Sequence, residues 1–295
     1  MFGEIREDFR GIPVLFFIAG EEERMGSFVE EKEVISKSFL LINGKPIFWN
    51  TFIILHELGF RDFYFITMKK GNKIKKYFEE NLKNFENVNI QLLTPSTLSE
   101  KKETNAINIY IFENKEKGTG DQLLTLKNAI RSEVFLQVYG DEYFGVEKDK
   151  VKREFRAFIE YALEKIEKEK AIEVLAFVDK KIAIGDTLKG LSIEKDKQDG
   201  KLTKTNESKF IPTSLCMFST ELLNILESEK EESIPLNVAS PSIIKRIIDS
   251  ERGYGKIINI ELFSNNNFPE NYLESVLVSM LLKEKRLYKN KLRIL

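Results

Sequence analysis

Residues 11–20 read GIPVLFFIAG, a continuous apolar run that ends at a glycine. A run of this kind is typical of a strand buried on both faces, as at the centre of a parallel sheet. Residues 21–24 then read EEER, so three carboxylates and one guanidinium follow the strand. A strand that enters a glycine-containing turn presents backbone N–H groups that bind phosphate, whereas carboxylates repel it. The turn is therefore a nucleotide site, an altered form of one, or a charged loop.

Strand-like and helix-like segments alternate along the first half of the chain. We expect strands at residues 61–67, 87–93, 107–112 and 133–141, and helices at 45–60, 72–85 and 120–132. In the first of these helices, Pro46 is expected at the start and Gly59 at the C-terminal end. The polar stretch 94–108 is typical of an insertion. The alternation predicts a doubly wound, mostly parallel sheet, in which ligands bind at the carboxyl ends of the strands.

The second half of the sequence is more mixed. We expect strands at residues 171–179, 190–196, 200–207 and 213–219, and helices at 152–170, 221–228, 241–249 and 269–284. The segment DKQDGK at 196–201 has the composition of a hairpin turn. Neither a shift in composition nor an internal repeat marks a boundary. We therefore expect one domain over residues 1–295, with a C-terminal helical part from about residue 221 and no β-helix tail.

The composition excludes several classes of function. The 46 Lys and Arg residues nearly balance the 47 Asp and Glu residues, so the net charge of −1 gives no footprint for nucleic acid or an anionic membrane. Cys216 is the single cysteine, which excludes an internal disulfide and fits a reducing compartment. His56 is the single histidine, which leaves little room for a histidine-based zinc site or catalytic triad. No apolar run reaches 18 residues. The expected location is the cytoplasm.

Four segments combine chemistry-bearing residues with an expected strand end. They are residues 15–26, 36–47, 117–123 and 138–144, which read LFFIAGEEERMG, SKSFLLINGKPI, KGTGDQL and VYGDEYF. The glycine-rich turn KGTGDQL opens a helix, so its main-chain donors are suited to a phosphate or a base. In the last segment, Asp141 follows a buried strand and is well placed to hold a divalent cation with waters and substrate phosphates.

The order and spacing of these segments resemble those of the sugar-phosphate nucleotidyltransferases. IAGEEERM and SKSFLLINGKPI stand where the family has A-A-G-x-G-T-R and P-K-P-L-L-P-V-x-x-K-P-I. KGTGDQL resembles its G-T-A-x-A-L turn, and FLQVYGDEYF its F-L-V-x-x-G-D-x-x-F strand. GLSIEKDKQDGKLTKTNES, LCMFSTELLNIL and NNNFPENYLES are similar to later family segments. The resemblance covers nearly the whole chain in order.

The resemblance implies a fold, a reaction and a cofactor. The fold is an α/β class, GT-A-like, Rossmann-related α/β/α sandwich with a mostly parallel mixed sheet. The reaction transfers a nucleoside monophosphate from a nucleoside triphosphate to a sugar 1-phosphate and releases pyrophosphate, with Mg2+ as cofactor. Because the attacking phosphate is already an anion, the step needs charge neutralisation and positioning more than acid–base groups.

The resemblance also assigns roles to individual residues. Arg24 falls at the family's catalytic arginine, Lys37 at its signature lysine and Asp141 at its first metal-ligand aspartate. Asn265 falls at the second metal position, where an amide replaces a carboxylate. Further positions match family contacts to the nucleotide, at Ala19, Gly20, Gly118 and Thr119, and to the sugar, at Gly190 and Glu207. Arg24, Lys37 and Glu207 are also compatible with ordinary solvated surface charges.

The sequence departs from the family pattern at several of its motifs. Glu22 and Glu23 replace a glycine and a hydroxyl residue in the first turn. Two unit charges about 4 Å apart interact by about 4 kcal/mol at an effective dielectric of 20, so a carboxylate facing a phosphate would weaken binding. Other replacements are Ser36 and Ser38 for prolines, Ser208 for the sugar-phosphate lysine, with Lys209 next to it, and Ser214 for a glycine. Glu142 or Glu261 could supplement Asp141 as a metal ligand.

Three functions therefore remain open. The first is a divergent nucleotidyltransferase acting on a nucleoside triphosphate and a sugar phosphate. The second is a catalytically inactive relative that acts as a regulatory or binding subunit, in a homo-oligomer or with a paralogous subunit. The third is a glycosyltransferase with a D-x-D-like site, which would need a second acid where Tyr143 stands.

Overall fold

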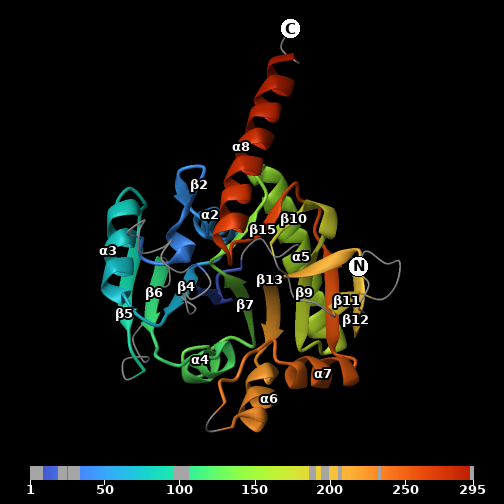
Figure 1. Cartoon of the computed structure of the whole chain (residues 1–295). Coiled ribbons are helices and arrows are strands. Elements are labelled where there is room, and N and C mark those ends of the chain that lie inside the picture. Colours follow the sequence, from blue (N-terminus) through green and yellow to red (C-terminus); the bar gives the residue numbers. More distant parts are fainter. Residues whose placement is uncertain are drawn as a thin grey trace.

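The protein is built around one large mixed sheet (Figure 1). The computed structural model describes residues 9–18, 25, 34–95, 106–185, 191–193, 199–204, 208–231 and 234–292. The strand order is β11-β12-β14-β9-β13-β7-β1-β4-β6-β5. The bounds are β1 (Val14–Phe17), β4 (Asp62–Thr67), β5 (Val88–Leu93), β6 (Ile107–Glu113), β7 (Val134–Tyr139), β9 (Glu173–Asp179), β11 (Leu191–Ile193), β12 (Asp199–Lys204), β13 (Phe210–Ser219) and β14 (Gly253–Ile257).

Strand β1 occupies the position that its apolar sequence predicts. It pairs in parallel with β4 on one side and with β7 on the other. Because successive side chains point to opposite faces of a sheet, Val14 and Phe16 enter one hydrophobic core while Leu15 and Phe17 enter a second. All four are buried. A strand with cores on both faces has no polar face to expose, which explains the continuous apolar run.

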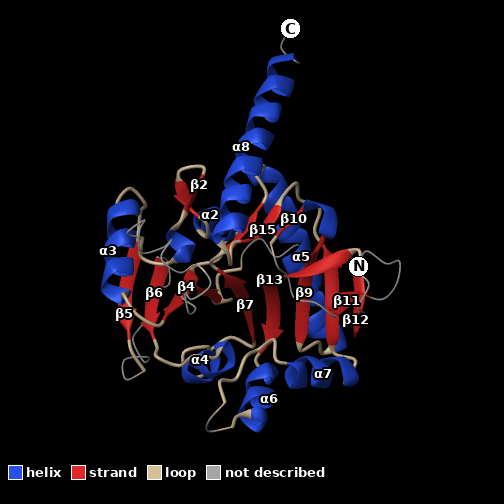
Figure 2. Cartoon of the chain, viewed as in Figure 1, coloured by secondary structure: helices blue, strands red, loops and turns tan. Residues whose placement is uncertain are grey.

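Helices cover both faces of the sheet (Figure 2). The first core packs under α2 (Trp49–Glu57), α3 (Gly71–Asn81) and α5 (Lys148–Glu169), and the second under α4 (Thr119–Leu126), α6 (Glu221–Glu229) and α7 (Pro241–Asp249). The layers are therefore helix, sheet, helix. This mostly parallel, Rossmann-like α/β sandwich confirms the expected fold class. None of the described helices is both long enough and apolar enough to cross a membrane.

Short strands and the last helix differ from the sequence-based expectation. A three-stranded sheet of β10 (Ala183–Ile184), β15 (Phe263–Asn265) and β8 (Glu142–Phe144) was not predicted, and neither was β14. The short helices η2 (Lys37–Phe39) and η3 (Lys180–Ile182) were also missed. The final helix, α8 (Pro269–Leu292), is longer than the expected 269–284, and its outer part projects from the rest of the chain (Figure 1).

The predicted start of the helix at residues 45–60 is wrong. Pro46 lies in β3 (Lys45–Pro46), which pairs with β2 (Leu41–Ile42), and the helix α2 starts only at Trp49. Asn43 and Gly44 join the two strands with φ angles of 54° and 77°. Positive φ at both central residues is the signature of a tight hairpin turn, for which Asn-Gly is a favoured pair. The hairpin therefore overrides the preference of proline for a first helical turn.

Aromatic rings fill the core beneath α2 and α3. Phe65 on β4 stacks on Phe16 of β1 with ring centroids 5.0 Å apart, and lies 4.5 Å from the ring of Phe78 on α3. Phe48 and Phe52 approach the Phe65 ring from the start of α2. This cluster holds the N-terminal helices against the strands that carry the candidate site.

Truncating the central ring should destabilise the fold strongly. Phe65 is fully buried, so Phe65→Ala leaves a cavity and should lower the free energy of unfolding by about 3–5 kcal/mol, as large-to-small aromatic core changes do. Urea unfolding followed by circular dichroism measures the change. Ile234→Ala, at a side chain that is 60% exposed, is the control and should change stability little. Equal effects of the two substitutions would contradict this account of the core.

Candidate functional site

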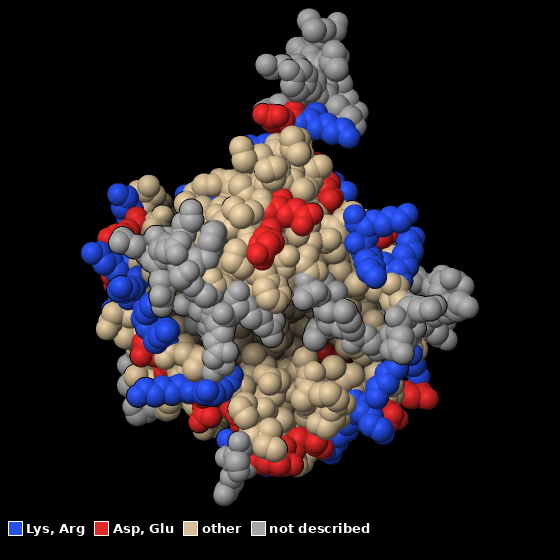
Figure 3. All heavy atoms as spheres, viewed as in Figure 1, with Lys and Arg blue, Asp and Glu red and all other residues tan. Residues whose placement is uncertain are grey.

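The candidate site lies where the carboxyl ends of β1 and β7 meet. Gly140 follows β7, and its N–H donates to the carbonyl of Phe17 at 2.8 Å. A Cβ at position 140 would lie 2.7 Å from Ile18 Cγ2 and 2.9 Å from Ser38 Oγ, so only glycine allows this approach. The contact brings Asp141 next to the segment 36–38. The surface is hollowed near the centre of the face drawn in Figure 3, below the base of the projecting helix.

Lys37 and Asp141, two residues assigned from sequence, form an ion pair. Lys37 lies on the short helix η2, and its Nζ is 2.5 Å from Asp141 Oδ2. The two side chains are only 14% and 8% exposed. Charges this far from water interact more strongly than surface pairs do, because solvent screens them less. The pair is therefore the electrostatic centre of the site.

Two serines hold the lysine segment against the end of β1. Ser36 Oγ and Ser38 Oγ both donate to the carbonyl of Ile18, at 2.8 Å and 3.1 Å. Both serines are buried. They stand at the positions where the family motif quoted above has prolines, and here hydrogen bonds position the segment. The departure from the family motif thus leaves a fixed lysine.

An asparagine segment closes the other side of the ion pair. Asn267 Oδ1 accepts a hydrogen bond from Lys37 Nζ at 2.6 Å, and its amide donates to Asn265 Oδ1. The N–H of Asn266 and its side-chain amide both donate to the carbonyl of Asp141, at 3.1 Å and 2.8 Å. Sequence reasoning placed Asn265 here and missed Asn267, which contacts the lysine directly. The run of three asparagines was the available signal.

The donor set can be tested for Mg2+. Among the described residues no group of three or more His, Cys, Asp or Glu side chains could hold a metal ion. Near Asp141, the side chains of Asn265 and Asn267 offer amide oxygens. The Glu142 carboxylate accepts hydrogen bonds from Ser214 instead, and the Glu261 carboxylate pairs with Lys150 at 3.1 Å. Mg2+ is usually bound by one or two carboxylates together with substrate phosphates. The residues present therefore fit an ion that arrives with phosphate, but they do not form a cage that holds one alone.

Glu142 is a buried acid whose role the sequence did not reveal. Its Oε2 accepts hydrogen bonds from the N–H of Ser214 at 2.8 Å and from Ser214 Oγ at 2.5 Å. Ser214 Oγ in turn accepts from the N–H of Tyr139. Burial raises the pKa of Glu142 to about 8 despite these hydrogen bonds. The network ties β8 to β13 and β7, and thereby fixes the backbone next to Asp141.

Gly118 and Thr119 lie at the N-terminus of α4, against another part of the chain. The N–H of Gly120 donates to the carbonyl of Leu236 at 2.8 Å, and the N–H of Thr119 to Asn237 Oδ1 at 3.2 Å. A Cβ on Gly118 would lie 2.1 Å from the Leu236 carbonyl oxygen. The glycine is therefore required by internal packing, and the donors of this turn have partners inside the protein. A role for Gly118 and Thr119 in nucleotide binding stays a prediction.

Several predicted site residues lie outside the described part of the chain. They are Ala19, Gly20, Arg24, Gly190 and Glu207, together with the glutamates at positions 22 and 23. The described residues on either side of the first turn, Ile18 and Met25, are both buried. The roles assigned to the residues between them stay predictions.

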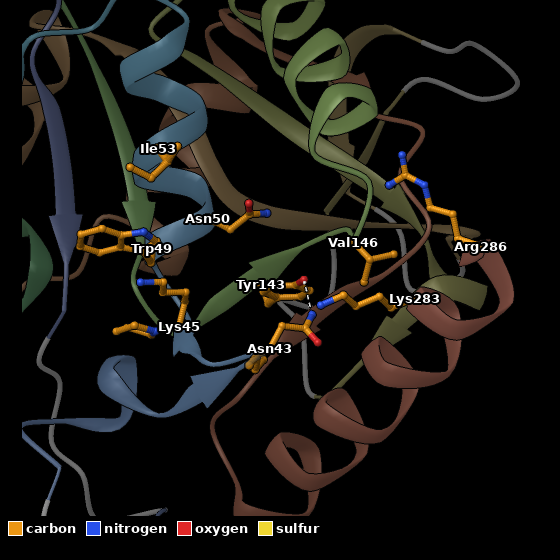
Figure 4. A pocket seen from close by; sticks show the side chains of 11 residues that line it. Asn43, Lys45, Trp49, Asn50, Ile53, Tyr143, Val146, Lys283 and Arg286 are labelled. Carbon is orange, nitrogen blue, oxygen red and sulfur yellow. Dashed lines mark hydrogen bonds between the residues drawn. The ribbon is translucent and has the colours of Figure 1, made fainter. Parts of the chain in front are cut away.

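A pocket lies between α2, α8 and the β2–β3 hairpin (Figure 4). Its volume is about 470 Å3. Asn43 and Tyr143 are joined by a hydrogen bond of 3.4 Å on its wall, and Lys283 and Arg286 of α8 face them. The Asn43 amide donates to the Tyr143 hydroxyl. Because tyrosine is not a carboxylic acid, the D-x-D-like site of the third open function has no second acid at this position.

Glu173 is a second buried acid, at the start of β9. It lines a cavity of about 30 Å3, large enough for a water molecule. Cys216 Sγ lies 3.7 Å from Glu173 Oε1, and the buried Gln137 Oε1 in the same lining has no hydrogen-bond partner among the described residues. Burial raises the pKa of Glu173 to about 7.

This pKa shift makes a testable link between pH and stability. The pKa of Glu173 in the folded protein is above the ordinary 4.5, so the folded state holds this proton more tightly than the unfolded state does. The resulting contribution to the free energy of unfolding is fully present below about pH 4.5 and is lost as the pH rises through about 7. Glu173→Gln keeps the side chain neutral at every pH. The unfolding free energy of this variant, relative to that of the wild type, should therefore rise by up to about 3 kcal/mol between pH 4.5 and pH 8. Urea unfolding at a series of pH values measures this, with exposed Glu270→Gln as control. Parallel pH profiles for the wild type and Glu173→Gln would refute the shift.

Comparison with solved structures identifies proteins that share this fold. No protein-family model matches the chain, and no curated protein matches it either. Solved structures do match over nearly the whole chain. A Bacillus anthracis protein assigned as a glucose-1-phosphate thymidylyltransferase, solved with sucrose, has a TM-score of 0.65 at 9% identity and covers 91% of this chain and 94% of its own.

Two further structures agree with it. A UDP-glucose pyrophosphorylase solved with UDP-glucose has a TM-score of 0.63 at 15% identity, covering 93% of this chain and 99% of its own. The inositol-1-phosphate CTP transferase from T. maritima has a TM-score of 0.59 at 11% identity, covering 88% and 90%. The chain therefore has the fold of the sugar-phosphate nucleotidyltransferases, at a sequence distance where the fold is all that the likeness establishes.

Proposed function

We propose that the chain is a divergent nucleotidyltransferase that transfers a nucleoside monophosphate from a nucleoside triphosphate to a sugar 1-phosphate and releases pyrophosphate. The observation that carries the proposal is the buried Lys37–Asp141 pair at the carboxyl ends of β1 and β7. In open α/β sheets, ligands bind at this edge. A fold shared with proteins of this activity gives the proposal its reaction class.

The described residues suit the charges of this reaction. The Lys37 ammonium, oriented by Asn267, would bind the phosphate that is transferred and would neutralise its growing negative charge. Asp141, with Asn265 beside it, would hold Mg2+, which supplies charge neutralisation to the phosphates when bound. Arg24 would contact the departing pyrophosphate. No general base is needed, because a sugar phosphate attacks as an anion.

The remaining assigned residues complete the proposed site. Ala19 and Gly20 would contact the base and phosphates from the first turn, with Gly118 and Thr119 on the other side of the nucleotide. Gly190 and Glu207 would contact the sugar. The first turn departs from the family pattern at Glu22 and Glu23, and the position after Glu207 departs from it at Ser208, so the base and the sugar are expected to be set by residues that differ from the family's.

A catalytically inactive subunit is the second candidate, and specific observations favour it. Glu22 and Glu23 place negative charge in the phosphate-binding turn. The donors at the start of α4 are taken by Leu236 and Asn237. The second metal position carries Asn265 rather than a carboxylate. Such a protein would keep the fold but release no pyrophosphate with any substrate.

Calorimetric titration of each nucleoside triphosphate, with and without Mg2+, separates the two candidates. The enzyme should bind one triphosphate in a Mg2+-dependent manner. Asp141→Asn should weaken that binding at least tenfold and Lys37→Ala similarly, since each removes a charge that the ligand meets in a desolvated site. Asp149→Asn makes the same chemical change on an exposed position of α5 and should bind as the wild type does.

The outcomes lead to different next steps. Metal-dependent binding that Asp141→Asn abolishes would justify a screen of sugar phosphates for pyrophosphate release with that triphosphate. Binding without release for any sugar phosphate would favour the inactive subunit. If no triphosphate binds to the folded wild type, the nucleotidyltransferase proposal is wrong.

A further inference from the structure

The helix α8 buries polar side chains and exposes apolar ones. Its inward face at the base carries the fully buried hydroxyls of Ser275 and Ser279. Ser279 Oγ accepts from the amide of Asn43 at 2.6 Å, and Ser275 Oγ donates to the carbonyl of Asn271 at 2.6 Å. Helices of globular proteins usually turn an apolar stripe to the core and polar residues to solvent. In α8, small polar residues occupy part of the buried face.

The outward face of α8 is strongly apolar. Leu273, Leu277, Met280 and Leu281 are between 57% and 61% exposed. The spacings of four and three residues from Leu273 to Met280 place them in one stripe, as in the seam of a coiled coil. Beside the base of the helix, Leu41 of β2 is 50% exposed, and its carbonyl accepts from the Tyr272 hydroxyl at 2.9 Å. Among the described residues, Ile234 is the only other large hydrophobic side chain exposed to this degree.

We propose that this stripe is the dimerisation surface of the protein, and that its occupant is the α8 stripe of a second copy in antiparallel orientation. Charge complementarity argues for a second copy. Exposed acidic residues, Glu270 and Glu274, lie near the N-terminus of α8. Toward the C-terminal end, the exposed bases Lys283, Lys285 and Arg286 outnumber one exposed acid, Glu284, so this part carries a net positive charge. Figure 3 shows acidic side chains below the tan surface at the base of the projecting helix.

An antiparallel pair matches these charges twice. In a pair centred on Met280, Glu274 lies six residues before the centre and Lys285 five residues after it. Each glutamate would therefore meet a lysine of the other copy, at about the same height along the helix. A two-fold axis repeats the contact, as expected for a symmetric dimer. A parallel pair would instead place like charges side by side.

The area of the stripe limits the expected affinity of the dimer. The stripe runs from Leu273 to Leu281, which is about 14 Å of a helix about 10 Å wide with its side chains, so the stripes of two copies present about 280 Å2 in projection. The convex side chains, Leu41 at the base and the exposed charged residues beside the stripe add to this area, which stays at or below the lower end of specific interfaces, about 1,000 Å2. We therefore expect a reversible dimer with a dissociation constant on the order of micromolar.

Sedimentation velocity over a concentration series tests the proposal. The full chain should change from monomer to dimer between about 1 µM and about 100 µM, which brackets the expected affinity. Leu277→Glu should stay monomeric over that range, because it places a charge in the apolar seam. Ile234→Glu makes a similar change at the exposed apolar residue outside α8 and should dimerise as the wild type does. Since both side chains are exposed, neither substitution should unfold the protein, which circular dichroism checks.

Charge reversal tests the antiparallel arrangement. Glu274→Lys alone and Lys285→Glu alone should each weaken the dimer several-fold, since each creates two like-charge contacts. The double variant should recover the wild-type affinity. A mixture of the two single variants should form a heterodimer more readily than either forms a homodimer, because both cross-contacts then pair opposite charges.

Three results would overturn the proposal. The first is a wild type that stays monomeric at about 100 µM, which would leave the stripe to a different partner. The second is a dimer that Leu277→Glu leaves intact, which would place the interface elsewhere. The third is a double charge variant no better than the single variants, which would exclude the antiparallel pairing.

Discussion

A lysine ammonium and an aspartate carboxylate lie 2.5 Å apart, mostly out of water, at the edge of the central sheet. Removing two charges from water is costly, and their attraction offsets that cost only when further hydrogen bonds satisfy both groups. The structure supplies such bonds: Asn267 accepts from the lysine, and Ser36 and Ser38 anchor the lysine segment to β1. Replacing such a pair with apolar residues is often neutral or stabilising. Its presence here is therefore better explained by what the two charges bind than by stability.

The ion pair depends on contacts between distant parts of the chain. Asp141 follows β7, and the lysine segment follows β1. Asn267 lies two residues after the end of β15 and two residues before the start of α8. The pairing of β8 with β15 sets Glu142 opposite Asn265 and so holds the asparagine segment beside the aspartate. The segment that orients Lys37 is thus also the anchor of α8. A projecting helix with an apolar outer face therefore follows directly after the asparagine segment that contacts the ion pair.

The sequence was sufficient for the large elements, and it singled out Lys37 and Asp141, whose side chains form an ion pair in the structure. The continuous apolar run of β1 and the alternation that follows it led to the correct fold class, because long periodic segments carry their structure locally. Strands of two or three residues, such as β8 and β15, are too short to show a period. The sequence predicts Pro46 in a helix because proline is favoured in a first helical turn, whereas the turn at Asn43 and Gly44 closes a hairpin whose second strand contains Pro46. Asn267 was missed because its partner Lys37 is 230 residues away. The extent of the domain and the roles of the residues outside the described ranges stay predictions.

The ion pair between Lys37 and Asp141 limits which ligand can bind in its place. An isolated anion would attract Lys37 but leave the Asp141 carboxylate buried without a counter-charge, and an isolated cation would do the reverse. Leaving one partner of a buried pair uncompensated costs about 3–5 kcal/mol. A triphosphate that carries its metal offers an anion to the lysine and a cation to the aspartate in one event, so one ion pair is exchanged for two. This balance favours a metal-bound nucleotide over either component alone, and it requires no second carboxylate from the protein. The replacement of an aspartate by Asn265 is therefore compatible with binding, provided that the metal comes with the phosphates.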